Sequence, residues 1–232
     1  MDDWDLAFIH YVSGLGLRHP AGARLVQTLA TGGLWRGGML MAVLWWYWFR
    51  RGSQDAAIRS RIIAAIGAAL AGLVLGRVVA LLLPFHLRPV FDPAANFQQT
   101  GVDAASPMQW WSSFPSDHMT TYFALATGCW FISRRLGLAA AAYVLVFIGL
   151  PRVYLGLHYP SDILGGAFMG ACVAAVVCST HFAPWWAAVL RWSERSPALF
   201  YAAAFLLTLE MSSMFDDLRD MTRSIYVLMV RT

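Results

Sequence analysis

The segment from Arg152 to Asp162 places a guanidinium, an imidazole and a carboxylate between two apolar runs. Polar side chains beside membrane-embedded segments are energetically costly and are commonly functional. Pro160 is typical of the first turn of a helix, because its missing N–H has no intrahelical partner there. The pattern predicts that a helix begins at Pro160, with His158 just before it and Asp162 in its first turn. We therefore expect the carboxylate of Asp162 to orient the imidazole of His158.

Two further polar clusters border apolar runs earlier in the chain. Arg88-Pro89 follows an apolar run that itself contains Arg77, and Pro115 to His118 opens the next apolar run. Arginine forks match the geometry of an oxyanion, preferably phosphate. The N-terminus of a helix beginning near Ser116 also favours an anion. These residue types together predict a phosphate-binding site.

The two histidines in these clusters suit phosphoryl transfer. Near neutral pH a histidine can act as a nucleophile or transfer a proton. We expect His158 to attack phosphorus with support from Asp162, and His118 to protonate the leaving oxygen. Water would then hydrolyse the phosphohistidine.

Apolar helices must position these groups. Of the 232 residues, 59% are hydrophobic and 13% are charged, whereas soluble domains average about 45–50% and about 25%. The composition predicts an all-α, integral membrane helical bundle that forms a single membrane-embedded domain over residues 1–232. The net charge of +4 comes from arginines in short loops, so we expect a bilayer rather than a nucleic acid as partner. The three cysteines lie in apolar runs without a Cys-x-x-Cys pair, which argues against a disulfide framework or a zinc site.

About six membrane spans are expected, because a crossing helix needs about 20 apolar residues. An N-terminal segment, 1–33, would lie at the membrane interface, with a helix over residues 4–17 followed by a Gly-rich connection. A polar loop over 84–115 and a shorter loop around 184–195 would separate spans. The expected spans are roughly 34–49, 61–83, 116–135, 138–155, 160–179 and 197–215.

Arginine placement predicts the orientation. Alternating spans put three arginine-bearing loops on one side, and the positive-inside rule makes that side cytoplasmic. Residues 84–115 and 152–162 then lie on the outer side, together with the polar clusters. The arginines concerned are Arg50, Arg51, Arg59, Arg61, Arg134, Arg135, Arg191 and Arg195.

The three clusters resemble the three-part signature of the type-2 phosphatidic acid phosphatase superfamily. That family includes bacterial lipid phosphatases, isoprenyl diphosphate phosphatases and vanadium haloperoxidases. The resemblance covers about residues 60–180, and each motif alone would be a weak signal. The matching positions are Arg88-Pro89, then Pro115-Ser116-x-His118, then Arg152-x5-His158-x3-Asp162.

The resemblance implies metal-free hydrolysis of a lipid phosphate or diphosphate without any cofactor. It favours a polyprenyl carrier such as undecaprenyl (di)phosphate, and phosphatidylglycerophosphate, phosphatidic acid and lipid A stay open. It also implies a multi-pass protein of the bacterial inner membrane with its active site facing the periplasm. The implied roles are nucleophile for His158, its partner for Asp162, general acid for His118, and phosphate ligands for Arg88, Arg152 and Ser116.

Three positions depart from the family pattern. Leu81 stands where the family usually has a lysine, and Arg77, one helical turn away on the same face, is the predicted substitute phosphate ligand. Asp117 replaces a glycine, so its carboxylate would repel phosphate unless it points away or meets an arginine. Pro151 replaces a serine, which removes a hydroxyl and an N–H from the phosphate cradle. We expect these changes to affect substrate preference.

Other interpretations of the same residues remain. A phosphotransferase would pass the phosphate to a second lipid, and a non-catalytic phospholipid binder or transporter would need the arginines without the histidines. A vanadium haloperoxidase would share the anion cradle, but its usual soluble context disagrees with this composition. The two histidines could also bind a metal with Asp117 and Asp162, although the spacing matches no familiar metal motif. His86 is expected at the membrane interface rather than in the site.

Overall fold

The computed structural model describes residues 3–18, 20–50, 55–97, 107–216 and 221 of the chain. Every regular element within these residues is a helix, which confirms the all-α prediction. The longer elements are α1 (Asp3–Arg18), α2 (Pro20–Thr31), α3 (Met39–Phe49), α4 (Asp55–Leu82), α5 (Asp117–Ile132), α6 (Arg134–Tyr143), α7 (Leu150–Tyr154), α8 (Pro160–Val177), α9 (Ala183–Arg195) and α10 (Pro197–Ser212). Two π-helical segments join them, η1 (Leu34–Gly38) before α3 and η5 (Val144–Gly149) between α6 and α7.

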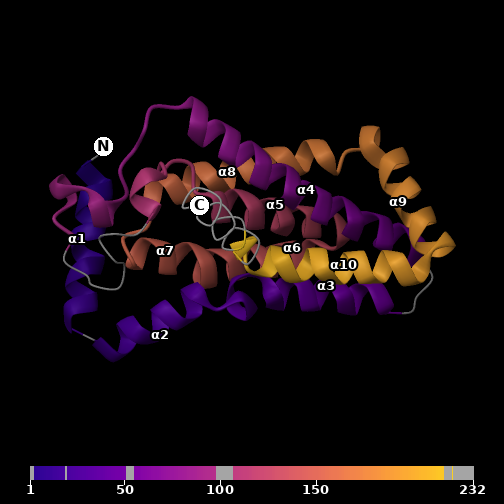
Figure 1. Ribbon diagram of the computed structural model, residues 1–232, viewed down its shortest axis with the longest axis horizontal. Helices are drawn as coiled ribbons and strands as arrows, with labels where there is room; N and C mark the ends of the chain where they lie inside the picture. The colour runs from indigo at the N-terminus through magenta and orange to yellow at the C-terminus, as the bar shows by residue number, and fades with distance from the viewer. Residues whose placement is uncertain (1–2, 19, 51–54, 98–106, 217–220, 222–232) are drawn as a thin grey trace, which may run out of the picture.

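The bundle is organised around α5. Most helices run along the long axis of the molecule, whereas α1 crosses one end and α9 lies at the other (Figure 1). Helix α5 packs against α4, α6 and α8, and its side chains Met119, Tyr122 and Leu125 are fully buried. At Gly128 a Cβ atom would lie only 2.6 Å from that of Ala65, so glycine lets α4 and α5 approach closely.

Three helical segments of the described chain are long and apolar enough to cross a membrane. They are Ala56–Leu82, Arg134–Tyr154 and Pro160–Val177, and the apolar helix Pro197–Ser212 is shorter. Large apolar side chains such as Leu82 and Phe168 are exposed on the outside of the bundle, as lipid-facing side chains are in a membrane protein. The chain is therefore a membrane protein, and the count of about six spans stays a prediction.

Two predicted connections were wrong, because both segments are largely helical. Residues 20–31 form α2, in which Pro20 begins the helix and Val26 and Ala30 pack on the apolar side chains of Leu155 and Leu157. Helix α9 likewise has its proline in the first turn. Proline breaks the interior of a helix but is well tolerated at its start. At both places the proline was interpreted as part of a connection, whereas it begins a helix. Helix α4 also begins six residues before the predicted span.

The two ends of the bundle carry different residues. The start of α8, the end of α7 and the short turns over 89–97 lie at the end crossed by α1 (Figure 1). The end of α3, the start of α4 and α9 lie at the opposite end, and these elements carry Arg59, Arg61, Arg191 and Arg195 of the arginines predicted to be cytoplasmic, with Arg50 directly after α3. This arrangement is what the predicted orientation requires, while the orientation itself stays a prediction.

Candidate active site

The three predicted clusters meet at a cavity of about 200 Å³, the site cavity, formed in part by Arg152 of α7 and by His158 just before α8. Four of the predicted site residues line it, namely Arg88, His118, Arg152 and His158. Asp162, Ser116 and Arg77 are not part of this lining. The remaining lining residues are Ala30, Thr31, Arg36, Trp111, Asp117 and Asp216.

The imidazole of His158 is fixed in one tautomer. Its Nδ1 lies 2.8 Å from the carbonyl oxygen of Ser113, a group that can only accept, so Nδ1 carries the hydrogen. Nε2 therefore keeps its lone pair, and it lies 3.4 Å from Nη1 of Arg88. Burial, with the nearby Arg88 charge, lowers the pKa of His158 below 6.5. A neutral imidazole with Nε2 at the cavity is the form that a nucleophile requires.

Asp162 supports His158 partly through Ser113. One carboxylate oxygen, Oδ2, lies 3.6 Å from Nδ1 of His158. The same oxygen accepts the backbone N–H of Tyr159 at 2.7 Å and the hydroxyl hydrogen of Ser113. The two residues are close, as predicted, but the hydrogen of His158 is directed to the serine carbonyl. Sequence reasoning missed Ser113, because a backbone carbonyl has no signature in the side-chain pattern.

His86 lies near the other oxygen of the same carboxylate. Its Nδ1 lies 3.7 Å from Oδ1 of Asp162, and its ring lies against Tyr159 with centroids 5.2 Å apart. The nearby carboxylate of Asp162 raises the pKa of His86 above 6.5. The sequence placed His86 only at the interface, whereas the structure also makes it a neighbour of the site.

Backbone carbonyls hold Arg88 beside the nucleophile. The guanidinium donates to the carbonyl of Leu157 at 3.0 Å and to that of Trp111 at 3.3 Å. Burial lowers the pKa of Arg88 to about 10, so this side chain is still a cation at neutral pH. Arg88 thus provides a fixed positive charge next to Nε2 of His158.

His118 and Arg152 form the other half of the lining. Nη2 of Arg152 lies 2.7 Å from Nε2 of His118 and 3.3 Å from the carbonyl oxygen of Ala30. A guanidinium can only donate, so Nε2 of His118 is the acceptor in this arrangement. Nε of Arg152 is buried and has no hydrogen-bond partner among the described residues.

Ser116 lies at the start of α5 with its hydroxyl available. Its backbone N–H donates to the carbonyl of Asp162 at 3.3 Å, which joins the starts of α5 and α8. Within the described part of the chain its buried Oγ has no hydrogen-bond partner. The predicted phosphate contact of Ser116 stays a prediction.

Arg77 and Asp117 form an ion pair at the edge of the cavity. Nη2 of Arg77 lies 2.5 Å from Oδ2 of Asp117, and the guanidinium lies 4.3 Å above the ring centre of Trp111. The carboxylate of Asp117 therefore meets an arginine, which is one of the two ways in which a phosphate could be tolerated beside it. Arg77 itself is not part of the cavity lining, and its role as a phosphate ligand stays a prediction.

A second ion pair at the cavity was not expected from the sequence. Nη2 of Arg36, in η1, lies 2.6 Å from Oδ2 of Asp216, just beyond α10. The two residues are far apart in the chain, so no local spacing could have linked them. Among the described residues no group of three or more His, Cys, Asp or Glu side chains is arranged to hold a metal ion, and metal independence stays a prediction.

With the fold and the site in view, the class of protein is defined. Residues 63–186, more than half of the chain, match the family described as the PAP2 superfamily. The chain therefore belongs to this superfamily, and all seven predicted site residues lie within the matched range. No solved structure gives a significant match to the chain.

Three bacterial relatives show what the chain is similar to. It is 35% identical over 144 residues to YbjG of Escherichia coli, provisionally named an undecaprenyl-diphosphatase, covering 60% of this chain and 64% of that one. It is 33% identical over 109 residues to the decaprenylphosphoryl-5-phosphoribose phosphatase of Mycobacterium tuberculosis (47% and 57% covered). It is 32% identical over 107 residues to the undecaprenyl-diphosphatase BcrC of Bacillus subtilis (46% and 51% covered). The chain thus spans less than two thirds of the length of these relatives.

Proposed function

We propose that the protein is a metal-independent lipid phosphate phosphatase that hydrolyses a polyprenyl (di)phosphate through a phosphohistidine intermediate. The observation that carries this proposal is the setting of His158. Its Nδ1 hydrogen is directed to the Ser113 carbonyl, and its Nε2 faces a cavity lined by Arg88 and Arg152. A pure phosphate binder would need the arginines, but it would not need an imidazole held in its nucleophilic tautomer.

The first chemical step transfers the phosphoryl group to the protein. Nε2 of His158 attacks phosphorus and forms a P–N bond while the P–O bond to the lipid breaks. The departing oxygen takes a proton from His118. The phosphorylated imidazole becomes cationic, and the Ser113 carbonyl and the Asp162 carboxylate stabilise that charge, as the carboxylate does in a triad.

The second step returns the protein to its starting state. Water attacks phosphorus and gives a proton to His118, which is neutral after the first step. The P–N bond breaks, inorganic phosphate leaves, and Nε2 of His158 regains its lone pair. Arg88 and Arg152 balance the negative charge on the phosphoryl oxygens throughout, and Ser116 adds a hydroxyl donor.

The contact between Arg152 and His118 links substrate binding to acid catalysis. Nη2 of Arg152 uses the Nε2 lone pair of His118, so His118 cannot hold its acidic proton there. A bound phosphate competes for the guanidinium, because charge-assisted bonds to phosphate are stronger than those to a neutral imidazole. Once Arg152 turns to the phosphate, Nε2 of His118 can take up the proton that it later delivers.

The lipid substrate and the location follow from the setting of the cavity. The cavity is lined by residues at the end of α7 and just before α8, in a bundle that exposes large apolar side chains, so a lipid can keep its chain in the bilayer while its phosphate is bound. The relatives named for undecaprenyl and decaprenyl substrates support a polyprenyl carrier. We place the protein in the bacterial inner membrane with the cavity facing the periplasm, because the arginine-rich loops lie at the other end.

The test is phosphate release by the purified protein in detergent, with and without EDTA. Undecaprenyl diphosphate, undecaprenyl phosphate, phosphatidic acid and lipid A would be compared, and the polyprenyl substrates should react fastest with no loss in EDTA. Rapid quenching with substrate labelled in the terminal phosphate should trap an acid-labile, base-stable phosphoprotein. Absence of phosphate release from every lipid would overturn the proposal, and label found on a second lipid would identify a phosphotransferase.

A further inference from the structure

Arg36 is a buried cation on the wall of the site cavity. The residue is 8% exposed and lies in the π-helical turn η1, an irregularity that is frequent at functional sites. Its position lies outside the range that matches the PAP2 superfamily, and the mechanism above does not use it. A buried charge needs a reason, because desolvating a guanidinium is costly.

The ion pair with Asp216 uses only half of one edge of this guanidinium. Nη2 contacts the carboxylate at 2.6 Å, while Nε, which shares that edge, is buried without a hydrogen-bond partner in the described chain. A phosphate group can accept from both nitrogens of an edge at once, and such paired contacts are stronger than single ones. The edge is therefore a better match for phosphate than for its present partner.

The two members of the pair differ in their freedom to move. The side chain of Arg36 is 10% exposed and that of Asp216 is 36% exposed. Next to Arg36, Gly37 lies so close to Tyr122 that a Cβ atom would be 2.5 Å from the tyrosine hydroxyl, so η1 is tightly packed on α5. Asp216 instead follows Met214 and Phe215, two residues in the left-handed backbone region at the end of α10. When the pair opens, the carboxylate is the member that can swing to solvent.

Arg36 belongs to the general-acid half of the cavity. Tyr122, which contacts Gly37, has its ring 6.5 Å from that of His118. Arg152 contacts both His118 and the carbonyl of Ala30, at the end of the helix that leads into η1. In the reaction above, His118 faces the oxygen that leaves with the lipid.

We propose that Arg36 is a third substrate-binding arginine, which holds the lipid-linked phosphate of a diphosphate substrate after displacing Asp216. This inference rests on the proposed function, and it makes that function selective for a diphosphate over a monophosphate. Arg88 and Arg152 hold the phosphate that His158 attacks, and Arg36 stabilises the charge that gathers on the second phosphate as it leaves. A monophosphate has no group to place there and leaves the Arg36–Asp216 pair closed.

The test compares undecaprenyl diphosphate with undecaprenyl phosphate as substrates. Because bonds between charged groups are lost, Arg36→Gln should lower kcat/KM for the diphosphate roughly 30- to 100-fold and that for the monophosphate less than about 3-fold. Asp216→Asn removes the competing carboxylate and should lower KM for the diphosphate. Inorganic pyrophosphate and phosphate, used as competitive inhibitors, give the same comparison independently of monophosphate turnover.

Two controls keep the result interpretable. Arg59→Gln removes an arginine that donates to the Trp48 carbonyl at the other end of the bundle. It should leave kcat/KM unchanged for both the diphosphate and the monophosphate. Arg36→Gln combined with Asp216→Asn removes both charges and so avoids an unpaired carboxylate. This double variant should fold, and its kcat/KM for the diphosphate relative to the monophosphate should stay as low as in Arg36→Gln. Equal losses of kcat/KM for both substrates, or no loss in an active Arg36→Gln protein, would overturn the proposed role of Arg36 but not the proposed function. A wild-type protein that releases no phosphate would instead overturn the proposed function.

Discussion

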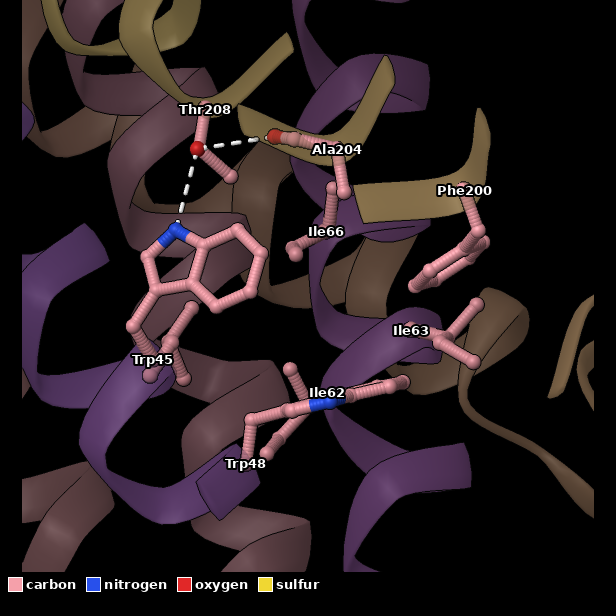
Figure 2. A pocket seen from close by; sticks show the side chains of 9 residues that line it. Trp45, Trp48, Ile62, Ile63, Ile66, Phe200, Ala204 and Thr208 are labelled. Atoms are coloured by element: carbon pink, nitrogen blue, oxygen red, sulfur yellow. Dashed lines mark hydrogen bonds between the residues drawn. The ribbon is translucent and has the colours of Figure 1, made fainter. Parts of the chain in front are cut away.

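The site cavity and an apolar pocket between α3, α4 and α10 lie toward opposite ends of the same bundle, and their walls are built differently. The apolar pocket has a volume of about 40 Å³ and is lined by Leu44, Trp45, Trp48, Ile62, Ile63, Ile66, Phe200, Ala204 and Thr208. Its polar atoms are matched, as Figure 2 shows for the Trp45 indole, which donates to Thr208 at 3.1 Å while Thr208 donates to the Ala204 carbonyl at 2.8 Å.

The walls of the site cavity leave polar atoms unmatched. Buried donor groups of Arg36 and Arg152 on the wall, and of the neighbouring Ser116, have no hydrogen-bond partner within the described residues. Such atoms lower stability unless something else binds them. One end of the bundle is therefore optimised for packing, whereas the other is less stable because it holds donors that are available to an anion.

The largest effect that this comparison predicts is on catalysis at His158. His158→Ala should reduce phosphate release by about 10⁴-fold or more, because the attacking nitrogen is removed. Phosphate release should be compared per folded protein, because the imidazole is buried and donates to the Ser113 carbonyl, so its loss should also lower the melting temperature somewhat. The control is His181→Ala, an exposed histidine that should affect neither measurement. Retained activity in His158→Ala would show that the cavity binds phosphate without attacking it.

A packing substitution in the apolar pocket should have the reverse effect. Trp48 is buried, stacks on Phe200 and donates to Tyr201 at 3.0 Å. Trp48→Ala should lower the free energy of unfolding by about 3–5 kcal/mol, with unchanged kcat for the folded fraction. Trp46→Ala, at an exposed neighbouring position, is the matched control and should lower it far less. A loss of kcat in folded Trp48→Ala protein would break the separation between the two ends.

The pH dependence of kcat/KM should also distinguish the site. His158 must be neutral to attack, and burial lowers its pKa below 6.5. The fall in kcat/KM on acidification should therefore begin at a lower pH than the pKa of a free imidazole. Below that lowered pKa the rate should fall about tenfold for each pH unit. The folded protein resists protonation at this group, so His158 also makes stability decrease as pH falls below 6.5. An acid limb with an apparent pKa of 6.5 or higher would contradict the burial argument.

The smallest predicted effect concerns the attachment of α1. Asp5 is buried and accepts the backbone N–H of Ser161 at 3.1 Å and its hydroxyl at 2.6 Å, which satisfies an open donor at the start of α8. Asp5→Ala removes both acceptors and should lower the free energy of unfolding by about 1–2 kcal/mol. Ser161→Ala, which removes one of the two bonds, should lower it less. A larger loss of unfolding free energy in Ser161→Ala than in the Asp5 variant would show that the hydroxyl bond contributes more than the bond to the helix N–H.

Local spacing explains how much of the site was predictable. The segment around His158 was expected to end one helix and begin another, and α8 does begin at Pro160. The motif residues were expected to converge, and Arg88, His118, Arg152 and His158 do line one cavity. Such patterns act over a few residues, where backbone geometry follows from the sequence.

What was missed depends on contacts between distant parts of the chain. The bond between Asp5 and Ser161 requires α1 to cross the end of the bundle, so no local pattern around Asp5 could reveal it. The pair of Arg36 and Asp216 forms only when η1 and the end of α10 pack together. These contacts arise from tertiary packing, for which a single sequence carries no periodic signal.

The packing of Tyr122 gives protein engineering a target outside the residues that attack or protonate the substrate. Its hydroxyl donates to the carbonyl of Met211 at 2.6 Å, near the end of α10, while its ring lies against Gly37. One side chain therefore sets the distance between the segment that carries Arg36 and the segment that carries Asp216. Directed evolution toward a different lipid headgroup can begin at Gly37, where an added methyl group must displace η1 or Tyr122 and so shift the position of Arg36.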